Sequence, residues 1–95
     1  MKVELTESAF TDLKNIIQYY QDQGAPEQGR RWTGEILKKS ERLSLHPDSG
    51  RIVPEFGLPF LRELIAPPFR VVYRRDPNKI WIIRIWRSER LLSLE

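Results

Sequence analysis

The sequence predicts an α+β domain in which an N-terminal strand and an antiparallel helical hairpin pack on a small, mainly antiparallel sheet. Apolar residues recur at helical spacing in the N-terminal half, whereas short apolar runs separated by turn residues fill the C-terminal third. The element order β-α-α-β-β-β places both helices on one face of the sheet. With 95 residues the chain has the length of one domain, so we expect residues 1–95 to form a single unit.

The N-terminal half carries the signals for one strand and two helices. Residues 1–5 alternate apolar and charged side chains, as a half-buried strand does. Thr6 then caps a first helix, which Gly24 ends. Pro26 suits the first turn of a second helix that runs to about Leu45. The expected apolar faces are Phe10, Leu13, Ile16, Ile17 and Tyr20 in the first helix and Trp32, Ile36 and Leu43 in the second.

Three strands are expected after a turn-rich loop. Residues 47–59 hold three prolines and two glycines, which indicates an ordered surface loop. The strands are expected at 60–66, 69–75 and 80–86, with turns at 67–68 and 76–79. Residues 87–95 fit either a short helix or a further strand.

Alternation within the strands predicts which side chains face the helices. In the second of the three strands Phe69, Val71 and Tyr73 form the core face, with the Tyr73 hydroxyl bonded at the sheet margin. The opposite face carries Arg70, Val72 and Arg74. In the third strand we expect Trp81, Ile83 and Ile85 to face the helices, and Arg84, Ile80, Ile82 and Trp86 to face away.

Composition limits the class of protein. The chain has no cysteine, which excludes a disulfide framework, a thiolate zinc site and a cysteine nucleophile, and suits a reducing cytoplasm. The N-terminus lacks the apolar core of a signal peptide. No apolar run approaches the ~20 residues of a membrane span. We therefore expect a cytoplasmic protein without a membrane segment.

Positive charge is concentrated near the C-terminus. Residues 1–61 hold eight Lys/Arg against nine Asp/Glu, whereas residues 62–95 hold eight against four. Seven of the latter eight cations are arginines, whose planar fork suits carboxylate or phosphate. This asymmetry predicts an anionic partner for the C-terminal third. The alternative is a solvated basic edge of the sheet.

Candidates for enzyme chemistry are few. The single histidine, His46, adjoins Pro47 at the end of the second helix, where a cation at the helix C-terminus or a surface residue is the usual role. The carboxylates show no metal-ligand spacing, and neither a glycine-rich phosphate loop nor a nucleophile elbow is present. Serine hydrolases, metalloenzymes and nucleotide-dependent enzymes are therefore disfavoured, and we expect no metal and no cofactor.

The arginines of the sheet give the strongest functional signal. Their expected surface mixes cations with aliphatic and aromatic groups, so it suits phosphates and stacked bases or an acidic, amphipathic peptide. The alternative is an ordinary exposed face with ion pairs to Glu63 and Glu89. The residues expected to bind a partner are Arg62, Arg70, Arg74, Arg84, Trp86, Arg87 and Arg90.

Residues 61–92 resemble the signature of the RelE/ParE toxin family. The resemblance comprises Arg62-Glu63-Leu64, the run Phe69-Arg70-Val71-Val72-Tyr73-Arg74, a polar turn at 76–79, and an apolar strand at 80–86 followed by basic residues at 87–90. The N-terminal strand and helical hairpin fit as well, so the resemblance spans nearly the whole chain.

The resemblance implies the toxin of a bacterial type II toxin–antitoxin pair, neutralised by a cognate antitoxin in a hetero-oligomer. RelE-like members cleave messenger RNA on the ribosome, whereas ParE-like members poison DNA gyrase. Arg62 and Arg70 match sheet arginines that bind RNA phosphates in the nuclease branch. Arg87 stands where many relatives have His, and no Tyr or His follows the last strand.

These departures favour a ParE-like toxin that inhibits growth by binding gyrase rather than by catalysis. The alternative is a ribosome-dependent endoribonuclease that uses Glu55, Arg62, Arg70 and Arg87, although Glu55 is expected to be a solvated loop carboxylate. A second alternative is a small RNA-binding or structural domain without toxicity.

Overall fold

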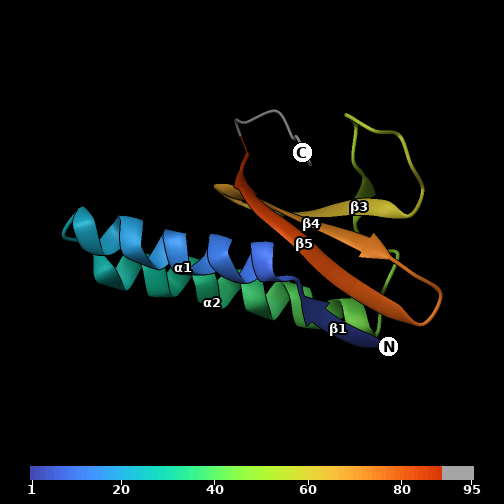
Figure 1. Ribbon diagram of the computed structural model, residues 1–95, viewed down its shortest axis with the longest axis horizontal. Helices are drawn as coiled ribbons and strands as arrows, with labels where there is room; N and C mark the ends of the chain where they lie inside the picture. Colours follow the sequence, from blue (N-terminus) through green and yellow to red (C-terminus); the bar gives the residue numbers. More distant parts are fainter. Residues whose placement is uncertain (89–95) are drawn as a thin grey trace.

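The computed structural model describes residues 1–88 and confirms the expected α+β class. A helical hairpin forms one layer and a five-stranded sheet forms the other (Figure 1). The elements are β1 (Lys2–Leu5), α1 (Glu7–Asp22), α2 (Pro26–Glu41), a 3-10 helix (Arg42–Ser44), β2 (Arg51–Ile52), β3 (Leu61–Ala66), β4 (Phe69–Arg75) and β5 (Lys79–Arg87). Arg90 and the rest of residues 89–95, whose conformation the sequence left open, lie outside the described residues.

The sheet has the strand order β1-β5-β4-β3-β2. The pairing is antiparallel except that β1 runs parallel to β5. The two-residue strand β2 was not expected from the sequence, because its segment is dominated by turn residues. β1 is also short and pairs with β5 only as far as Ile82. Beyond Ile82, the backbone at this edge of β5 is therefore open to hydrogen bonds from residues outside the sheet.

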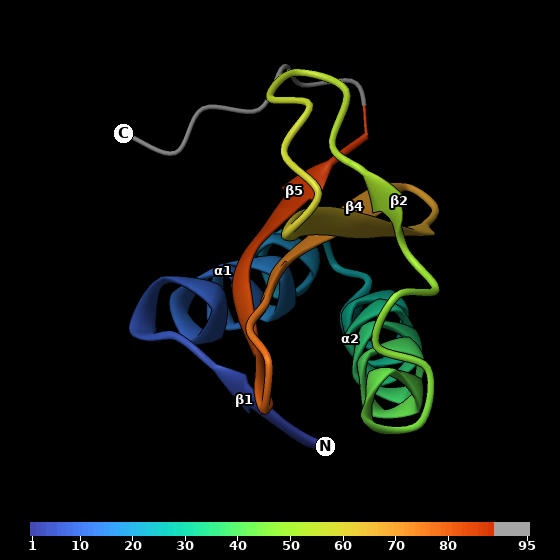
Figure 2. The same ribbon diagram turned by 90° about the vertical axis from the view of Figure 1, so that its right-hand side faces the viewer.

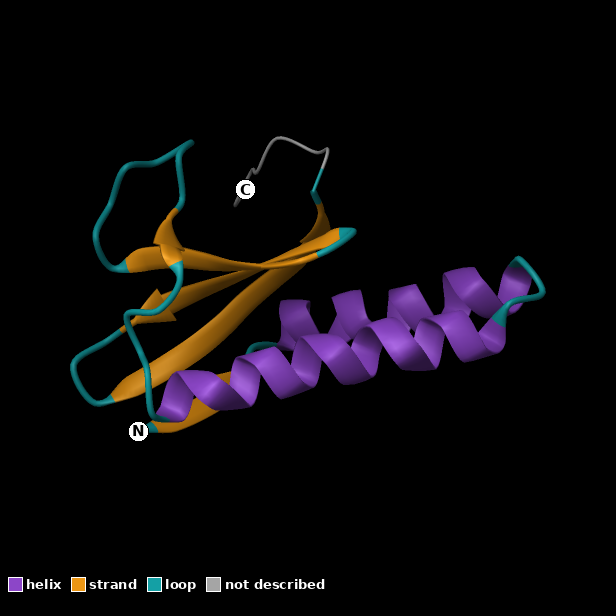
Figure 3. Cartoon of the chain, turned by 180° about the vertical axis from the view of Figure 1, so that it is seen from behind, coloured by secondary structure: helices purple, strands orange, loops and turns teal. Residues whose placement is uncertain are grey.

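The helical hairpin begins and turns at the residues that the sequence predicts. The Thr6 hydroxyl accepts the N–H of Ala9 at 3.1 Å and so caps α1. Gly24 takes a positive φ of 72° in the turn, and Pro26 is the first residue of α2. α2 ends at Glu41, because the chain tightens there into the 3-10 helix instead of continuing to about Leu45. Figures 2 and 3 show the two helices side by side, with their connecting turn projecting beyond the sheet.

The main core lies between the hairpin and the sheet. The expectation that Phe10 belongs to this core is wrong, because its side chain is 54% exposed and Ala9 takes the inward position. The spacing Ala9, Leu13, Ile16 keeps the inner stripe on one face of α1. The buried members of this cluster are Ala9, Leu13, Ile16, Ile36, Leu43, Ala66, Phe69, Val71, Tyr73, Ile80, Ile82 and Ile85.

The expected facing of β5 is also wrong for two of three residues. Val72 lies opposite Arg84 but Tyr73 lies opposite Ile82, so Ile83 is an extra residue in the ladder. Such a bulge reverses the alternation of side chains beyond it. Ile80 and Ile82 consequently face the helices before the bulge, and Ile85 faces them after it. Trp81 and Ile83 lie outside this core, which strict alternation could not anticipate.

Tyr73 behaves as predicted and ties the sheet to the loop before β2. Its ring is fully buried, and its hydroxyl donates to the Pro47 carbonyl at 2.9 Å and accepts the N–H of Gly50 at 3.0 Å. A Cβ at Gly50 would come within 2.7 Å of this ring, so the approach requires glycine. Burial raises the pKa of the Tyr73 hydroxyl, which keeps it neutral. Within residues 1–88, no helix is long and apolar enough to cross a membrane.

Candidate functional site

The sheet face turned away from the helices holds a buried network of two arginines and two glutamates. Arg70, on β4, donates through Nε to Glu63 Oε1 at 2.7 Å. Its two terminal nitrogens donate to the two carboxylate oxygens of Glu55, each at 2.8 Å. Arg51 donates to the other oxygen of Glu63 at 2.6 Å. Glu63 is almost completely buried, and Arg70 is only 5% exposed.

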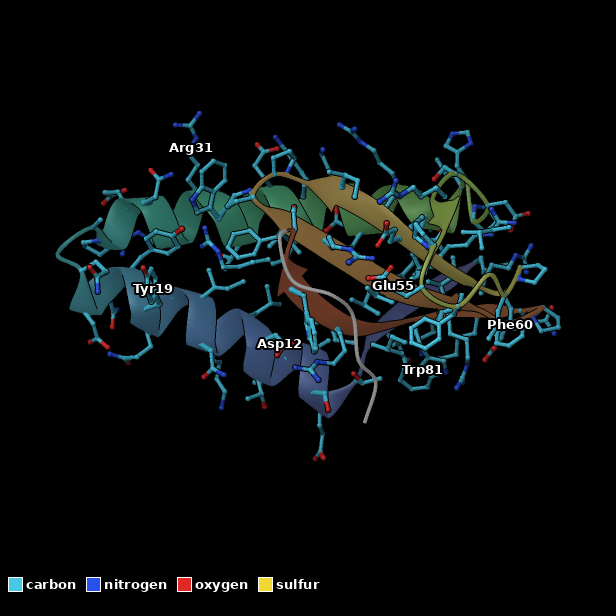
Figure 4. The ribbon with its side chains drawn as sticks, turned by 90° about the horizontal axis from the view of Figure 1, so that it is seen from above. Asp12, Tyr19, Arg31, Glu55, Phe60 and Trp81 are labelled. Atoms are coloured by element: carbon cyan, nitrogen blue, oxygen red, sulfur yellow. The ribbon has the colours of Figure 1, made fainter. Side chains whose placement is uncertain are left out.

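This network corrects the expectation that Glu55 is a solvated loop carboxylate. Its side chain is only 21% exposed, and Figure 4 shows it above the sheet, within the loop that leads to β3. The hydrogen bond from Arg70 to Glu55, with that to Glu63, raises the pKa of the guanidinium above its ordinary value. Arg70 therefore lies within the protein's own ion pairs, and a partner reaches it only if a carboxylate is exchanged.

Arg62 does not join Arg70. On β3, Arg62 lies opposite Tyr73, whereas Arg70 lies opposite Ile65, so the two arginines are on opposite faces of the sheet. Arg62 donates to the carbonyls of Pro59 and Gly50, both at 3.0 Å. It thus fastens the two ends of the loop around β2.

Arg84 is paired across the gap between β5 and α1. Its guanidinium donates to both oxygens of Asp12, at 2.9 and 3.1 Å. Asp12 also accepts the backbone N–H of Ile85 at 2.8 Å, at the part of the β5 edge that β1 leaves uncovered. Asp12 was not among the site residues predicted from the sequence. Its spacing with Asn15 and Tyr19 along the border of the apolar stripe is the signal that could have identified it.

A cavity of about 490 Å³ lies beside this ion pair, between α1 and the ends of β4 and β5. Trp86 contributes a buried indole N–H that has no hydrogen-bond acceptor within residues 1–88. The Arg84 guanidinium lies 5.0 Å from the centre of the Trp86 ring. The lining is Asp12, Asn15, Ile16, Tyr19, Tyr20, Phe69, Arg84, Ile85, Trp86 and Arg87.

The remaining predicted arginines occupy separate places. Arg74 is half exposed and forms a bidentate pair with Asp76 in the β4–β5 turn. Arg87 lies opposite Phe69 at the end of β5, with its guanidinium 5.7 Å from the Phe69 ring centre. The arginines thus do not gather into one basic surface. Arg84 and Arg87, with Trp86, flank the cavity, whereas Arg70 lies in the buried network.

Exposed apolar side chains concentrate around the loop between β2 and β3. Of the ten large hydrophobic residues exposed among those described, five fall within residues 52–65. Figure 4 places Phe60 of this set at the same end of the sheet as Trp81. The five are Ile52, Phe56, Leu58, Phe60 and Ile65. A smaller apolar cluster of Val53, Leu61 and Val72 lies on the outer face, with Ile83 and Trp86 packed against it.

The four residues that RNA cleavage was expected to use do not lie around one point. Glu55 and Arg70 are paired with each other, while Arg62 lies on the opposite face. Arg87, opposite Phe69, also points away from the face that carries Arg70. Within the described part of the chain, no group of three His, Cys, Asp or Glu side chains is placed to hold a metal ion.

Comparison with known proteins assigns the family. Residues 3–92 match the family model described as the ParE toxin of the type II toxin-antitoxin system parDE. The chain belongs to the ParE toxin family. Its fold is similar to a solved structure described as the chromosomal ParDE TA system from P. aeruginosa, with 27% sequence identity and a TM-score of 0.78. That match covers 94% of this chain and 97% of the other. No curated protein matches the sequence.

The family assignment confirms the resemblance that the sequence of β3 to β5 indicated. This ParE family member is therefore a toxin component of a type II toxin–antitoxin system.

Proposed function

We propose that this ParE family toxin inhibits growth in the cytoplasm by binding DNA gyrase, without catalysis, and that a cognate antitoxin neutralises it. The supporting observation is the separation of the groups that RNA cleavage would need. Arg62 and Arg70 lie on opposite faces of the sheet, so they cannot hold one phosphate between them. Glu55 is held in a bidentate ion pair, which opposes its use as a general base. The absence of cysteine suits a reducing compartment.

The cavity between α1 and β5 is the surface that we assign to the antitoxin. Its lining combines apolar side chains such as Ile16 and Phe69 with polar ones, and Arg84 and Arg87 lie at its border, where Asp12 pairs with Arg84. An amphipathic antitoxin segment with acidic residues fits such a mixed lining, and the resulting complex is a hetero-oligomer.

Binding variants test the antitoxin surface. Trp86→Ala and Arg87→Glu should each weaken the complex with the product of the adjacent antitoxin gene, by about 2 kcal/mol or more if the contact is central. Arg31→Glu, on the exposed side of α2, is the matched control and should leave the dissociation constant unchanged. Isothermal titration calorimetry measures all three. If the two cavity variants bind as tightly as the unmodified chain, the antitoxin lies elsewhere.

Pulse-labelling tests the target. The chain is induced alone in a bacterial host, and DNA and protein synthesis are followed separately. Early loss of DNA synthesis with filamentous cells supports gyrase poisoning. Early loss of protein synthesis instead supports the RelE-like endoribonuclease, with Glu55, Arg62, Arg70 and Arg87 as the residues to re-examine. If neither process falls while folded protein accumulates, the chain is a non-toxic RNA-binding or structural domain.

A further inference from the structure

We infer that Arg70 is a carboxylate-binding site that Glu55 fills in the unbound chain and that an acidic side chain of a partner protein takes over on binding. The site lies on the outer face of the sheet, on the opposite side of β4 from the main core. It rests on the proposed function only for the identity of the partner, which is the antitoxin if that proposal holds.

The geometry of Arg70 separates a permanent ligand from an exchangeable one. Glu63 accepts from the Nε side of the guanidinium, and its side chain is completely buried within β3. Glu55 accepts from both terminal nitrogens, which point toward the loop, and it is partly exposed. A paired fork of this kind is the arrangement in which arginine binds carboxylates most strongly. Loss of Glu55 leaves Arg70 still paired with Glu63, so the exchange does not strip the guanidinium of all its partners.

The loop that carries Glu55 is anchored on either side of it rather than along its length. The N–H of Val53 donates to the Leu61 carbonyl at 3.1 Å, and the Val53 side chain is fully buried. Pro59 is held at its carbonyl by Arg62. Between these anchors, and within residues 1–88, the backbone N–H groups of Phe56 and Gly57 donate to the Val53 carbonyl, inside the turn itself. Glu55 can therefore leave Arg70 while both anchors stay in place.

Space for an incoming side chain adjoins the network. A hollow of about 560 Å³ is lined by Arg51, Pro54, Glu55, Ile65, Arg70 and Ser88. Pro54 and Ile65 give it an apolar border, and Ile65 is about two-fifths exposed. An occupant that combines one charged group with apolar neighbours fits this environment, as a peptide segment with a single Asp or Glu does.

The charges of the described network suit a single carboxylate better than a polyanion. Among residues 1–88, the network of Arg51, Arg70, Glu55 and Glu63 sums to zero charge, so these four groups offer no net attraction to a nucleic acid backbone. When Glu55 withdraws, the remaining three groups carry one positive charge. One incoming carboxylate restores neutrality, whereas each further negative charge would be unpaired.

Removing the Glu55 carboxylate should raise the affinity of Arg70 for an added carboxylate. A purely structural ion pair predicts no such increase, so the direction of the change distinguishes the two. Hexanoate, a carboxylate on an apolar chain, serves as the probe and is titrated into the labelled full chain while the Arg70 Nε–Hε resonance is followed. If Glu55 leaves Arg70 in a tenth or less of the molecules, Glu55→Gln should bind hexanoate about tenfold more tightly or better. Glu55→Asp keeps the charge but shortens the reach, so its affinity should fall between the two.

Controls make each outcome decisive. Glu27→Gln removes an exposed carboxylate paired with Arg30 on α2 and should leave hexanoate binding unchanged. Hexanol, which lacks the carboxylate, should not shift the Arg70 resonance. The inference is overturned if Glu55→Gln keeps the Arg70 resonance of a folded chain yet binds hexanoate no more tightly than the unmodified protein. It is also overturned if inorganic phosphate binds the variant more tightly than hexanoate, which would indicate a nucleic acid site.

This test is independent of the antitoxin. Tighter hexanoate binding together with absence of any antitoxin complex would leave the carboxylate site standing and refute the proposed neutralisation. The reverse result would refute the exchange at Arg70 and leave the antitoxin cavity beside Trp86 unaffected.

Discussion

The two faces of the sheet are built on different principles. The face toward α1 and α2 is a continuous apolar core in which Ile80, Ile82 and Ile85 pack against the helical stripes. The outer face places a small apolar cluster beside the buried charges of Glu63 and Arg70. Apolar packing on the first face supplies stability without demanding particular partners. The outer face instead depends on each charge finding its own counterpart, because an unmatched buried charge is costly.

This difference separates the roles of the faces. The helix side holds the fold together through the main core, and the cavity between α1 and the end of β5 lies at its edge. The outer side keeps a carboxylate, Glu55, on a loop and leaves apolar side chains exposed around it. Substitutions on the two faces should therefore differ in how much they lower the free energy of unfolding. They should also differ in whether a second substitution restores it.

The largest loss of stability is expected for Glu63→Ala. Both Arg51 and Arg70 lose a ligand, and breaking a buried pair from one side costs about 3–5 kcal/mol. Urea denaturation measures the change in the free energy of unfolding. Replacing Glu63 and Arg70 together by Met should recover most of it, since the two fully buried charges are then gone and the charges that remain, Arg51 and Glu55, are the more exposed members of the network. A loss below about 1 kcal/mol for Glu63→Ala would contradict the buried network.

Ile82→Ala should follow, with a loss of about 3 kcal/mol from a cavity in the main core. Its matched control is Ile83→Ala, the extra residue at the bulge, which is only partly buried and should cost about 1 kcal/mol. Thermal and urea unfolding of the two variants side by side check the order. If Ile83→Ala proves the more destabilising, the bulge is misplaced and simple alternation of β5 holds.

A smaller effect is expected for Tyr73→Phe. The ring stays in the core, but the N–H of Gly50 and the carbonyl of Pro47 lose their shared partner, which costs about 1–2 kcal/mol. Hydrogen exchange should show faster exchange at the Gly50 amide, whereas amides within α1 should be affected only through the change in global stability. Unchanged protection at Gly50 would mean that water replaces the hydroxyl.

The smallest effect is expected for Arg74→Ala. Arg74 and Asp76 form an exposed pair in the β4–β5 turn, and such pairs contribute about 0–1 kcal/mol. High salt should remove even this contribution. A loss above 2 kcal/mol would show that the exposed turn behaves like the buried network, and the contrast between the faces would not hold.

The sequence was sufficient for both helices, for every strand except β2, and for most of the core. Helix boundaries at Thr6, Gly24 and Pro26 follow from local capping and turn chemistry, and the buried Tyr73 follows from alternation within β4. The bulge at Ile83 escaped prediction, because one extra residue in a ladder leaves no compositional mark.

The candidate site was harder to predict than the fold. The arginines were expected on one surface, but partners distant in sequence place some of them elsewhere, as Asp12 does for Arg84. Glu55 was expected in solvent because it lies between turn residues, and its pairing with Arg70 depends on how the loop folds back over the sheet. Pairing between residues distant in sequence depends on the tertiary structure. The local sequence pattern can therefore indicate a candidate residue but not its partner.

The most direct test of the account is a supercoiling assay with purified DNA gyrase and the purified chain, followed in parallel by incubation of ribosomes and messenger RNA with the same preparation. We expect the added chain to inhibit gyrase supercoiling in proportion to its amount, added antitoxin to restore it, and the messenger RNA to stay intact. Unimpaired gyrase together with cleaved messenger RNA would contradict the proposal that this ParE family toxin acts by binding rather than by catalysis.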